Sequence, residues 1–273
     1  MSLNLYPPSV GSSESTIAAP WYMQVARGLV PGASVVNVYG YQNSFPGSTA
    51  SSGAFSTVWE LNTNASFTPY AYPSSAIQML LYSTTPGTPA SDINVSVLIN
   101  GLDASYNPIS ETLTLTNGAT GVTTVNSYLR INSIQTVGSV NALGTLYLSN
   151  SGKTVTYAVI ALTGSVSNGK SQMMIYTVPN GYTFYLTRSN AYSSLNGNTA
   201  GNYSYYRVYT QSNTGVIQTL LQAPFTNEYG TLRVAPRPYT QKTDIQWQVA
   251  AAPTSASAVG IGVEGILISN TAV

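Results

Sequence analysis

The segment 171–192 constrains the fold most strongly, because it reads as two β-strands joined by a tight turn. In the turn Pro179-Asn180-Gly181, proline fixes φ at the first position, asparagine tolerates the second, and glycine accepts a positive φ at the exit. Beyond the turn, Phe184 and Leu186 point to one face and their neighbours to the other, as in a half-buried strand. The second strand, 182–192, is too long for one short partner, so we predict that the segment connects elements of a larger sandwich.

The same style of short strands between Gly, Pro, Asn and Ser clusters continues along the chain and predicts an all-β fold with two sandwich blocks. In the block 35–150, seven strands with regular turn signals predict an Ig-like β-sandwich. In the block 151–273, eight strands predict a jelly-roll-like sandwich. One alternative stays open, since strands that cross between the blocks would form one continuous sandwich. The predicted strands are Val35–Tyr41, Thr57–Leu61, Ile77–Tyr82, Ile93–Asn100, Ile109–Leu115, Ser127–Val137 and Thr145–Leu148 in the first block, and Thr154–Leu162, Gln172–Val178, Tyr182–Tyr192, Tyr203–Thr210, Val216–Gln222, Thr231–Val234, Asp244–Val249 and Ile261–Ile268 in the second.

Residues 1–34 differ from the rest, because prolines and glycines interrupt every regular element. We expect an extended N-terminal arm with one helical turn near Tyr22–Ala26. Such an arm is either disordered or laid over a neighbouring molecule. A tryptophan beside a tyrosine favours the second option, since disordered tails are poor in aromatic residues. Trp21, Tyr22 and Arg27 are therefore candidate interface residues, and packing onto the protein's own core is the alternative.

The chain carries very little charge, and this limits its partners. Charged residues make up 6% of the sequence and the net charge is +1, whereas roughly a quarter of the residues in a typical soluble protein are charged. Nucleic acids and anionic membranes both attract clustered positive charge, so neither is an expected partner. Weak colloidal repulsion favours a subunit that buries much of its surface in an assembly. The alternative is that abundant Ser, Thr, Asn and Gln keep a monomer soluble.

The residue types needed for most catalytic and metal sites are missing. Without histidine or cysteine the chain cannot build a Ser-His-Asp triad, a Cys-His pair or an ordinary zinc site. The remaining enzymatic option is a paired-carboxylate glycosidase, but the acidic residues are scattered singly. Asp103, Ser105 and Asn107 begin like a calcium loop, yet the central glycine and the trailing glutamate are absent. We therefore expect no catalytic residues, no cofactor and no metal.

Tyrosine is the most distinctive side chain, with 21 copies. In the predicted strand Tyr203–Thr210, the side chains of Tyr203, Tyr205, Arg207 and Tyr209 share one face. A row of Tyr and Arg is typical of the centre of a protein interface. Internal packing of the phenol groups and stacking on sugar rings are the alternatives.

Two further arginines, Arg233 and Arg237, lie in the segment T-L-R-V-A-P-R-P-Y-T. Its prolines block normal sheet pairing, so we predict a sheet edge or a loop. The arginines are candidates to meet carboxylates of a neighbouring molecule, or they are simply solubilising charges.

Several stretches resemble virion structural proteins of tailed bacteriophages, especially phages of marine bacteria and cyanobacteria. The resemblance spans most of the chain but not its first 30 residues. It consists of similar short stretches of sequence and includes no active-site motif. The stretches are V-V-N-V-Y-G-Y-Q (35–42), T-V-W-E-L-N (57–62), I-N-G-L-D-A-S-Y-N-P-I-S-E-T (99–112), M-I-Y-T-V-P-N-G-Y-T-F-Y-L-T-R (174–188), K-T-D-I-Q-W-Q-V (242–249) and G-V-E-G-I-L-I (262–268).

This resemblance implies a non-enzymatic particle component, either a capsid decoration or cement protein or a tail or fibre accessory. The implied partners are the major capsid protein or other virion proteins and further copies of this chain, with a trimer favoured by analogy. A tail accessory would also bind host glycan. The N-terminal sequence lacks the basic start and apolar run of a signal peptide, and no apolar stretch approaches the roughly 20 residues of a membrane span. We therefore expect synthesis in the bacterial cytoplasm and a final location in the virion.

Overall fold

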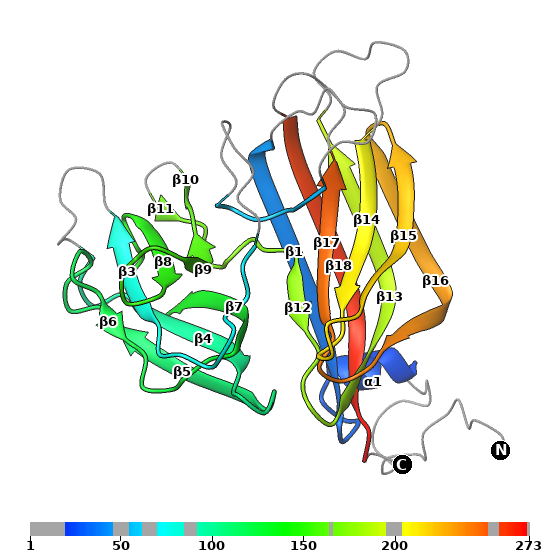
Figure 1. Cartoon of the computed structure of the whole chain (residues 1–273), viewed down its shortest axis with the longest axis horizontal. Coiled ribbons are helices and arrows are strands. Elements are labelled where there is room, and N and C mark those ends of the chain that lie inside the picture. Colours follow the sequence, from blue (N-terminus) through cyan, green and yellow to red (C-terminus); the bar gives the residue numbers. More distant parts are fainter. Residues whose placement is uncertain are drawn as a thin grey trace, which may run out of the picture.

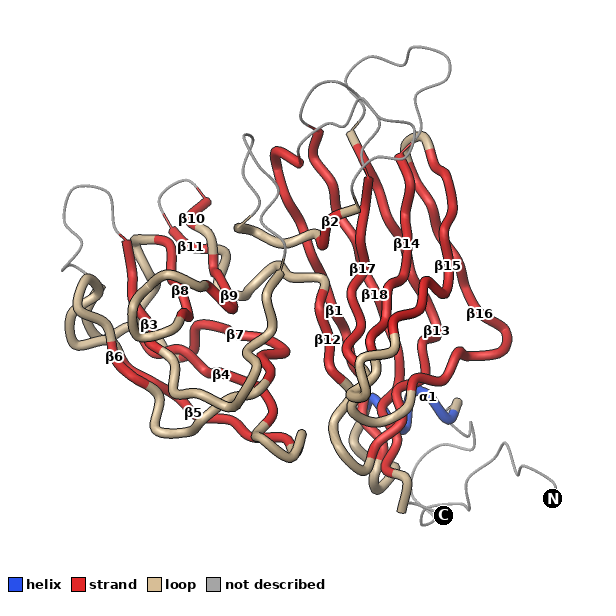
Figure 2. The backbone as a smooth tube through the Cα atoms, viewed as in Figure 1, coloured by secondary structure: helices blue, strands red, loops and turns tan. Residues whose placement is uncertain are grey.

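A computed structural model describes residues 20–45, 55–61, 70–84, 92–163, 166–194, 204–250 and 257–271. Strands dominate these residues (Figure 2), which confirms the predicted all-β class. The one helix among them is α1 (Trp21–Ala26), where a helical turn was expected. Residues 1–19 lie outside the described part. The described remainder of the predicted arm contains α1, a turn and the first two residues of strand β1. Val25 of α1 is buried.

Two antiparallel sheets face each other and form an eight-stranded jelly roll (Figure 1). The first sheet has the order β1 (Ala33–Phe45), β18 (Ser257–Ser269), β13 (Tyr182–Ser193) and β16 (Glu228–Tyr239). The second has the order β12 (Ile175–Thr177), β17 (Asp244–Ala250), β14 (Ser204–Gln211) and β15 (Ile217–Phe225), and β2 (Ser56–Thr57) also pairs with β17. With β2 and β12 counted as one interrupted second strand, the orders along the chain are 1-8-3-6 and 2-7-4-5. This is the strand order of a jelly roll.

The residues between β2 and β12 form a smaller β module, which we call the insert. An isolated bridge between Trp59 and Met173 closes its base. Seven of its strands form one sheet of four and one sheet of three. An Ig-like sandwich has the same numbers of strands in its two sheets, but their order differs from the order here. The sheets have the orders β6-β3-β8-β9 and β5-β4-β7, and β10 pairs with β11. The bounds are β3 (Leu80–Thr84), β4 (Ser96–Leu102), β5 (Pro108–Thr114), β6 (Val122–Thr123), β7 (Arg130–Val137), β8 (Thr145–Ser149), β9 (Thr156–Ile160), β10 (Leu162–Thr163) and β11 (Val166–Ser167).

The sheets do not divide the chain at residue 150, where the two predicted blocks meet. Strand β1 pairs with β18 along nearly its whole length, and β2 pairs with β17, so both belong to the jelly roll. Strand β9, beyond residue 150, pairs with β8 of the insert. Strands therefore cross between the blocks, as the open alternative allowed. Two buried clusters follow this grouping, one around Phe184 and Trp247 in the jelly roll and one around Trp59 and Tyr128 in the insert.

The segment 171–192 does connect two parts of a larger sandwich. Strand β12 lies in one sheet and β13 in the other, and the turn between them crosses from sheet to sheet. Gly181 has φ +78°, and its N–H donates to Gln241 Oε1 at 2.6 Å. Phe184 and Leu186 are fully buried on the inner face, as their alternation predicted.

Candidate functional site

A buried ion pair fixes the insert against the jelly roll. Arg130 of β7 donates from Nε and Nη2 to both carboxylate oxygens of Asp244 in β17, at 2.8 and 2.9 Å. Its Nη1 donates to the carbonyl oxygens of Leu129 and Pro73, and Thr177 Oγ1 donates to Asp244 at 2.6 Å. The two side chains are 11% and 5% exposed. Such a pair contributes specificity of docking, because either charge left alone would be costly.

The environment of Arg130 keeps it charged. Burial by itself lowers the pKa of the guanidinium, but the hydrogen bonds and charge of Asp244 outweigh burial and raise that pKa. The guanidinium also lies over the rings of Tyr72 and Tyr106, at 4.5 and 5.5 Å from their centroids. A well-satisfied charge pair therefore helps to fix the position of the insert against the jelly roll.

A second carboxylate, Glu60, holds the base of the insert. Its oxygens accept from Ala161 N at 3.1 Å and Asn168 Nδ2 at 2.7 Å. Burial raises the pKa of Glu60 to about 7, although the hydrogen bonds from Asn168 and Ala161 oppose this rise. The side chain is thus poised to change its charge near neutral pH.

Other carboxylates of the insert fasten loops in the same way. Each accepts backbone N–H groups, which is a structural role and leaves no oxygen pair poised over a cleft. Asp92 accepts from Leu143 N at 2.8 Å and from Gly144 N at 3.0 Å. Asp103 accepts from Ser105 N at 2.8 Å and from Asn107 N at 2.9 Å. Glu111 accepts from Val125 N at 2.9 Å and from Asn126 N at 3.1 Å. Within the described ranges, no three of the His, Cys, Asp and Glu residues gather as metal ligands would.

The predicted tyrosine row on β14 is present in its described part. Tyr205, Arg207 and Tyr209 share one half-buried face, and Tyr206 and Val208 are buried on the other. Tyr203 lies outside the described residues. Arg207 and Tyr209 line a cleft, and the role of the row in contacting a partner stays a prediction.

That cleft, of about 360 Å³, lies beside β14 and β17. The Arg207 guanidinium lies 4.1 Å from the centre of the Phe55 ring, and its Nε donates to Gln248 Oε1 at 2.6 Å. Burial lowers the pKa of Arg207. Aromatic faces combined with a few amide and guanidinium groups are a lining suited to a small polar ligand. The lining consists of Phe55, Ser56, Thr57, Tyr70, Tyr72, Arg207, Tyr209, Gln211, Gln246 and Gln248.

The two arginines of β16 lie on a sheet edge, as their flanking prolines predicted. Among the described residues, strand β16 pairs with β13 alone, and the register jumps from Leu232 to Arg237, so the residues between them bulge from the ladder. Arg237 Nη1 donates to the carbonyl oxygen of Leu220 in β15 at 3.0 Å and bridges the two sheets. Burial raises the pKa of Tyr239, and the charges of Arg237 and Arg233 oppose this rise. The structure gives both arginines internal neighbours, and contact with another molecule stays a prediction.

The residues in and directly after α1 differ in their exposure. Trp21 is half-buried, whereas Tyr22 and Arg27 are exposed. Met23 and Leu29 add exposed apolar surface nearby. The end of the jelly roll that carries α1 therefore offers an apolar surface, and contact of Trp21, Tyr22 and Arg27 with a partner stays a prediction.

Sequence reasoning missed an exposed aromatic group, which we call the tyrosine surface: Tyr39, Tyr41 and Tyr192. These side chains are 49%, 36% and 44% exposed on the outer face of the first sheet. Tyr41 and Tyr192 stack with centroids 6.4 Å apart. The register places Gly260 between them and Gly262 beside Tyr39. The alternating pattern Tyr-Gly-Tyr in 39–41 and Gly-Ile-Gly in 260–262 is the available sequence signal.

Gly260 allows the Tyr192 ring to lie over the sheet, because a Cβ atom on Gly260 would stand 2.1 Å from Cζ of Tyr192. A Cβ atom on Gly262 would meet Asn190 Oδ1 at 2.6 Å and would make only an ordinary contact of 3.4 Å with the Tyr39 ring. Aromatic rings over strand glycines cover backbone that would otherwise be bare. The result is a flat aromatic surface on a rigid sheet.

Comparisons with known proteins do not assign this chain to a family. No protein-family model and no curated protein matches it. Among solved structures, it is similar to the Gx strain of infectious bursal disease virus, with a TM-score of 0.22, 11% identity, and coverage of 92% of this chain and 77% of that chain. A VP2 subviral particle of the same virus gives a TM-score of 0.22, 11% identity, and coverage of 92% and 78%. Likenesses at this TM-score carry no argument about fold or role. In the part of the chain that the structure describes, no helix is long and apolar enough to cross a membrane.

Proposed function

We propose that the protein is a non-enzymatic structural subunit of a tailed-phage particle, of the capsid decoration or cement type. In this role it binds the major capsid protein or other virion proteins, and further copies of itself, and its location is the virion. A trimer is the arrangement that fold analogy favours. The subunit acts by adhesion: neutral faces bury area against neighbours and resist expansion of the shell without chemistry.

The tyrosine surface is the observation that carries this proposal. Its three rings are each roughly two-fifths exposed, and an aromatic side chain buries 150–250 Å², so covering them removes about 250 Å² from water. At about 25 cal/mol per Å² this contributes about 6 kcal/mol, similar to the roughly 4–15 kcal/mol that association costs. One such contact is weak alone, and many copies on a shell together bind firmly.

Two other features support a building role. Jelly rolls occur in viral capsid and lectin domains, although a fold alone does not decide a function. The carboxylates described above hold loops and the insert, which leaves a sparsely charged exterior. Both fit a subunit whose surfaces are covered after assembly.

Imaging of purified phage particles tests the proposal directly. We expect this chain at regular positions on the shell, in many copies per particle. In a binding assay with stripped particles, Tyr39→Ser/Tyr41→Ser/Tyr192→Ser should abolish attachment. The control Val216→Ser/Ile217→Ser/Leu232→Ser changes apolar residues elsewhere that are more exposed than the three tyrosines, and it should attach normally. Particles that lack the chain, or hold it only at the tail tip, would overturn the decoration role.

The cleft beside Arg207 favours one alternative function, a tail or fibre accessory that binds host surface polysaccharide. Its aromatic rings would stack on sugar rings, and its amide groups would bond hydroxyls. A glycan array with the full chain distinguishes the two roles. Reproducible binding that Tyr209→Ala removes and Tyr22→Ala leaves intact would replace the decoration proposal.

A further inference from the structure

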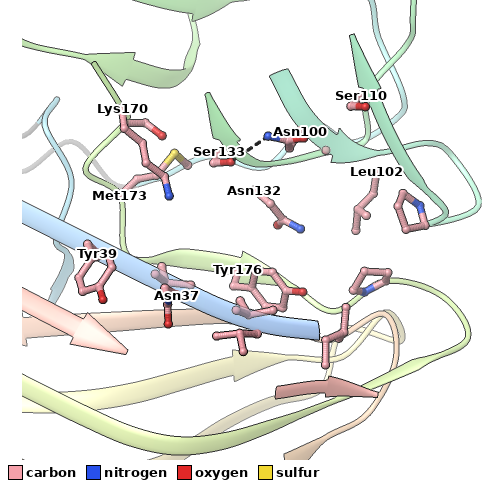
Figure 3. A pocket seen from close by; sticks show the side chains of 18 of the residues that line it. Asn37, Tyr39, Asn100, Leu102, Ser110, Asn132, Ser133, Lys170, Met173 and Tyr176 are labelled. Atoms are coloured by element: carbon pink, nitrogen blue, oxygen red, sulfur yellow. Dashed lines mark hydrogen bonds between the residues drawn. The ribbon is translucent and has the colours of Figure 1, made fainter. Parts of the chain in front are cut away.

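A groove of about 620 Å³ separates strand β1 from the insert (Figure 3). Five consecutive residues of β1, 35–39, line one wall. Side chains alternate between the two faces of a strand, so a groove bordered by five consecutive residues runs along the strand's edge. Among the residues that the structure describes, nothing pairs with this edge, because β1 ends its sheet and its one described partner is β18.

The opposite wall comes from the insert. Figure 3 shows Asn100, Asn132 and Ser133 on that side, with Lys170 and Met173 at one end. The β1 edge therefore faces a second wall and not open solvent. A flat protein edge cannot reach it, whereas a single extended segment can enter between the walls and add a strand to the sheet.

The other sheet edges of the jelly roll are protected. Asn132 accepts from Thr177 N at 2.8 Å and donates to Thr177 O at 3.1 Å, so the insert occupies the edge of β12. Strand β16 carries two prolines and a bulge, and β15 carries one proline and receives Arg237 at Leu220. Strand β1 has neither proline nor a charged residue in its 13 residues. Natural sheets rarely leave such an edge open, because it invites pairing with another chain.

Residues 1–19 have the properties of a suitable occupant. They carry a single charged side chain, Glu14, and Lys170 is the single charged side chain of the groove. The stretch Ser2–Tyr6 alternates polar residues with Leu3 and Leu5, as a strand with one buried side does. Two prolines follow and would end the pairing. At about 3.3 Å per residue, nineteen residues reach about 60 Å.

The position of α1 favours the groove of a second copy over the segment's own groove. The C-terminal end of α1 leads into β1, and α1 extends from there under the jelly roll towards β16, on the side away from the insert (Figure 1). The N-terminal end of α1, to which residues 1–19 connect, therefore lies on the side of the jelly roll away from its own groove. We propose that residues 1–19 of a second copy enter the groove and pair with the free edge of β1. This inference rests on the self-association in the proposed function and names the contact that makes it.

Cysteine trapping in the full chain tests the pairing, since the natural sequence contains no cysteine. One copy carries Leu5→Cys and one affinity tag, and a second copy carries Asn37→Cys and another tag. After mixing and mild oxidation, we expect a disulfide-linked pair that contains both tags. The matched control is Gln218→Cys on the β15 edge, which is as exposed as Asn37 and should give no link with Leu5→Cys.

A groove-filling variant gives a second readout. Ser110→Arg places a long side chain in the groove and should abolish the cross-link. Thr112→Arg changes an exposed residue on the same face of β5 outside the groove and should leave the cross-link unchanged.

The outcomes separate the inference from the function on which it rests. A cross-link with both tags that Ser110→Arg removes supports strand exchange. If the double variant Leu5→Cys/Asn37→Cys closes only within one chain, the second-copy assignment is wrong. Copies that associate by sedimentation but form no such link would overturn the inference and leave the structural role intact. A chain that stays monomeric under all conditions would overturn both.

Discussion

Removal of Arg130 should loosen the insert from the jelly roll more than any surface change. In Arg130→Met, the carboxylate of Asp244 keeps the hydroxyl of Thr177 but loses both charge-assisted bonds, and it stays buried. Breaking a buried pair from one side costs about 3–5 kcal/mol. A loss of 4 kcal/mol corresponds to a change of about a thousandfold in the unfolding equilibrium.

Urea unfolding with tryptophan fluorescence measures this loss, because Trp59 lies in the core of the insert and Trp247 in that of the jelly roll. We expect the Trp59 signal to change at lower urea than the Trp247 signal in Arg130→Met. In the double variant Arg130→Met/Asp244→Leu, most of the lost stability should return, since no buried charge remains without a partner.

The matched control is Arg188→Met. Arg188 and Glu264 form an exposed pair at 3.9 Å, with side chains 56% and 46% exposed, and such pairs contribute about 0–1 kcal/mol. If Arg130→Met costs no more than Arg188→Met, or if the double variant is as unstable as the single one, the ion pair does not hold the insert and the reasoning fails.

Two further predictions concern single sites. The pKa of Glu60 is raised from 4.5 to about 7, so the folded state holds a proton that the unfolded state releases. The free energy of unfolding should therefore fall by at most about 3 kcal/mol as pH rises from 5 to 8. Thermal unfolding of Glu60→Gln should lack this part of the pH dependence, and equal slopes in both proteins would contradict the prediction. Gly260→Ala should displace the Tyr192 ring and cost about 1–3 kcal/mol in urea unfolding, whereas Gly230→Ala, with nothing within 4 Å of its added methyl, should be nearly neutral; equal effects would show that the ring does not rest on Gly260.

Local features of the sequence predict the strands well, but they do not show which distant strands pair with each other. The alternation around Phe184 and Leu186 and the Pro179-Asn180-Gly181 turn depend on neighbouring residues, so both could be recognised directly. The sheets do not follow the two predicted blocks, because β1 and β2 pair with the last strands of the chain. No local signal marks an insert between two halves of one strand.

The candidate surfaces show the same limit. The shared face of Tyr205, Arg207 and Tyr209 followed from strand periodicity, but the cleft beside it requires Phe55 and Tyr72 from distant segments. The tyrosine surface was missed because its rings and its glycines come from three strands. Pairing of Tyr41 and Tyr192 across Gly260 becomes visible only when the register is known.

The low charge of the chain acquires a physical reason once the carboxylates are placed. Asp92 and Glu111 hold loops through backbone N–H groups, and Asp244 holds the insert through Arg130. These carboxylates have hydrogen-bond partners within the chain, and Arg130 also neutralises the charge of Asp244. The few charged residues of the chain give its exterior little long-range repulsion. An exterior of this kind leaves contact to flat aromatic rings and to an unpaired strand edge, and both act only at short range. Specific contact through these two features then depends on matching shape and register.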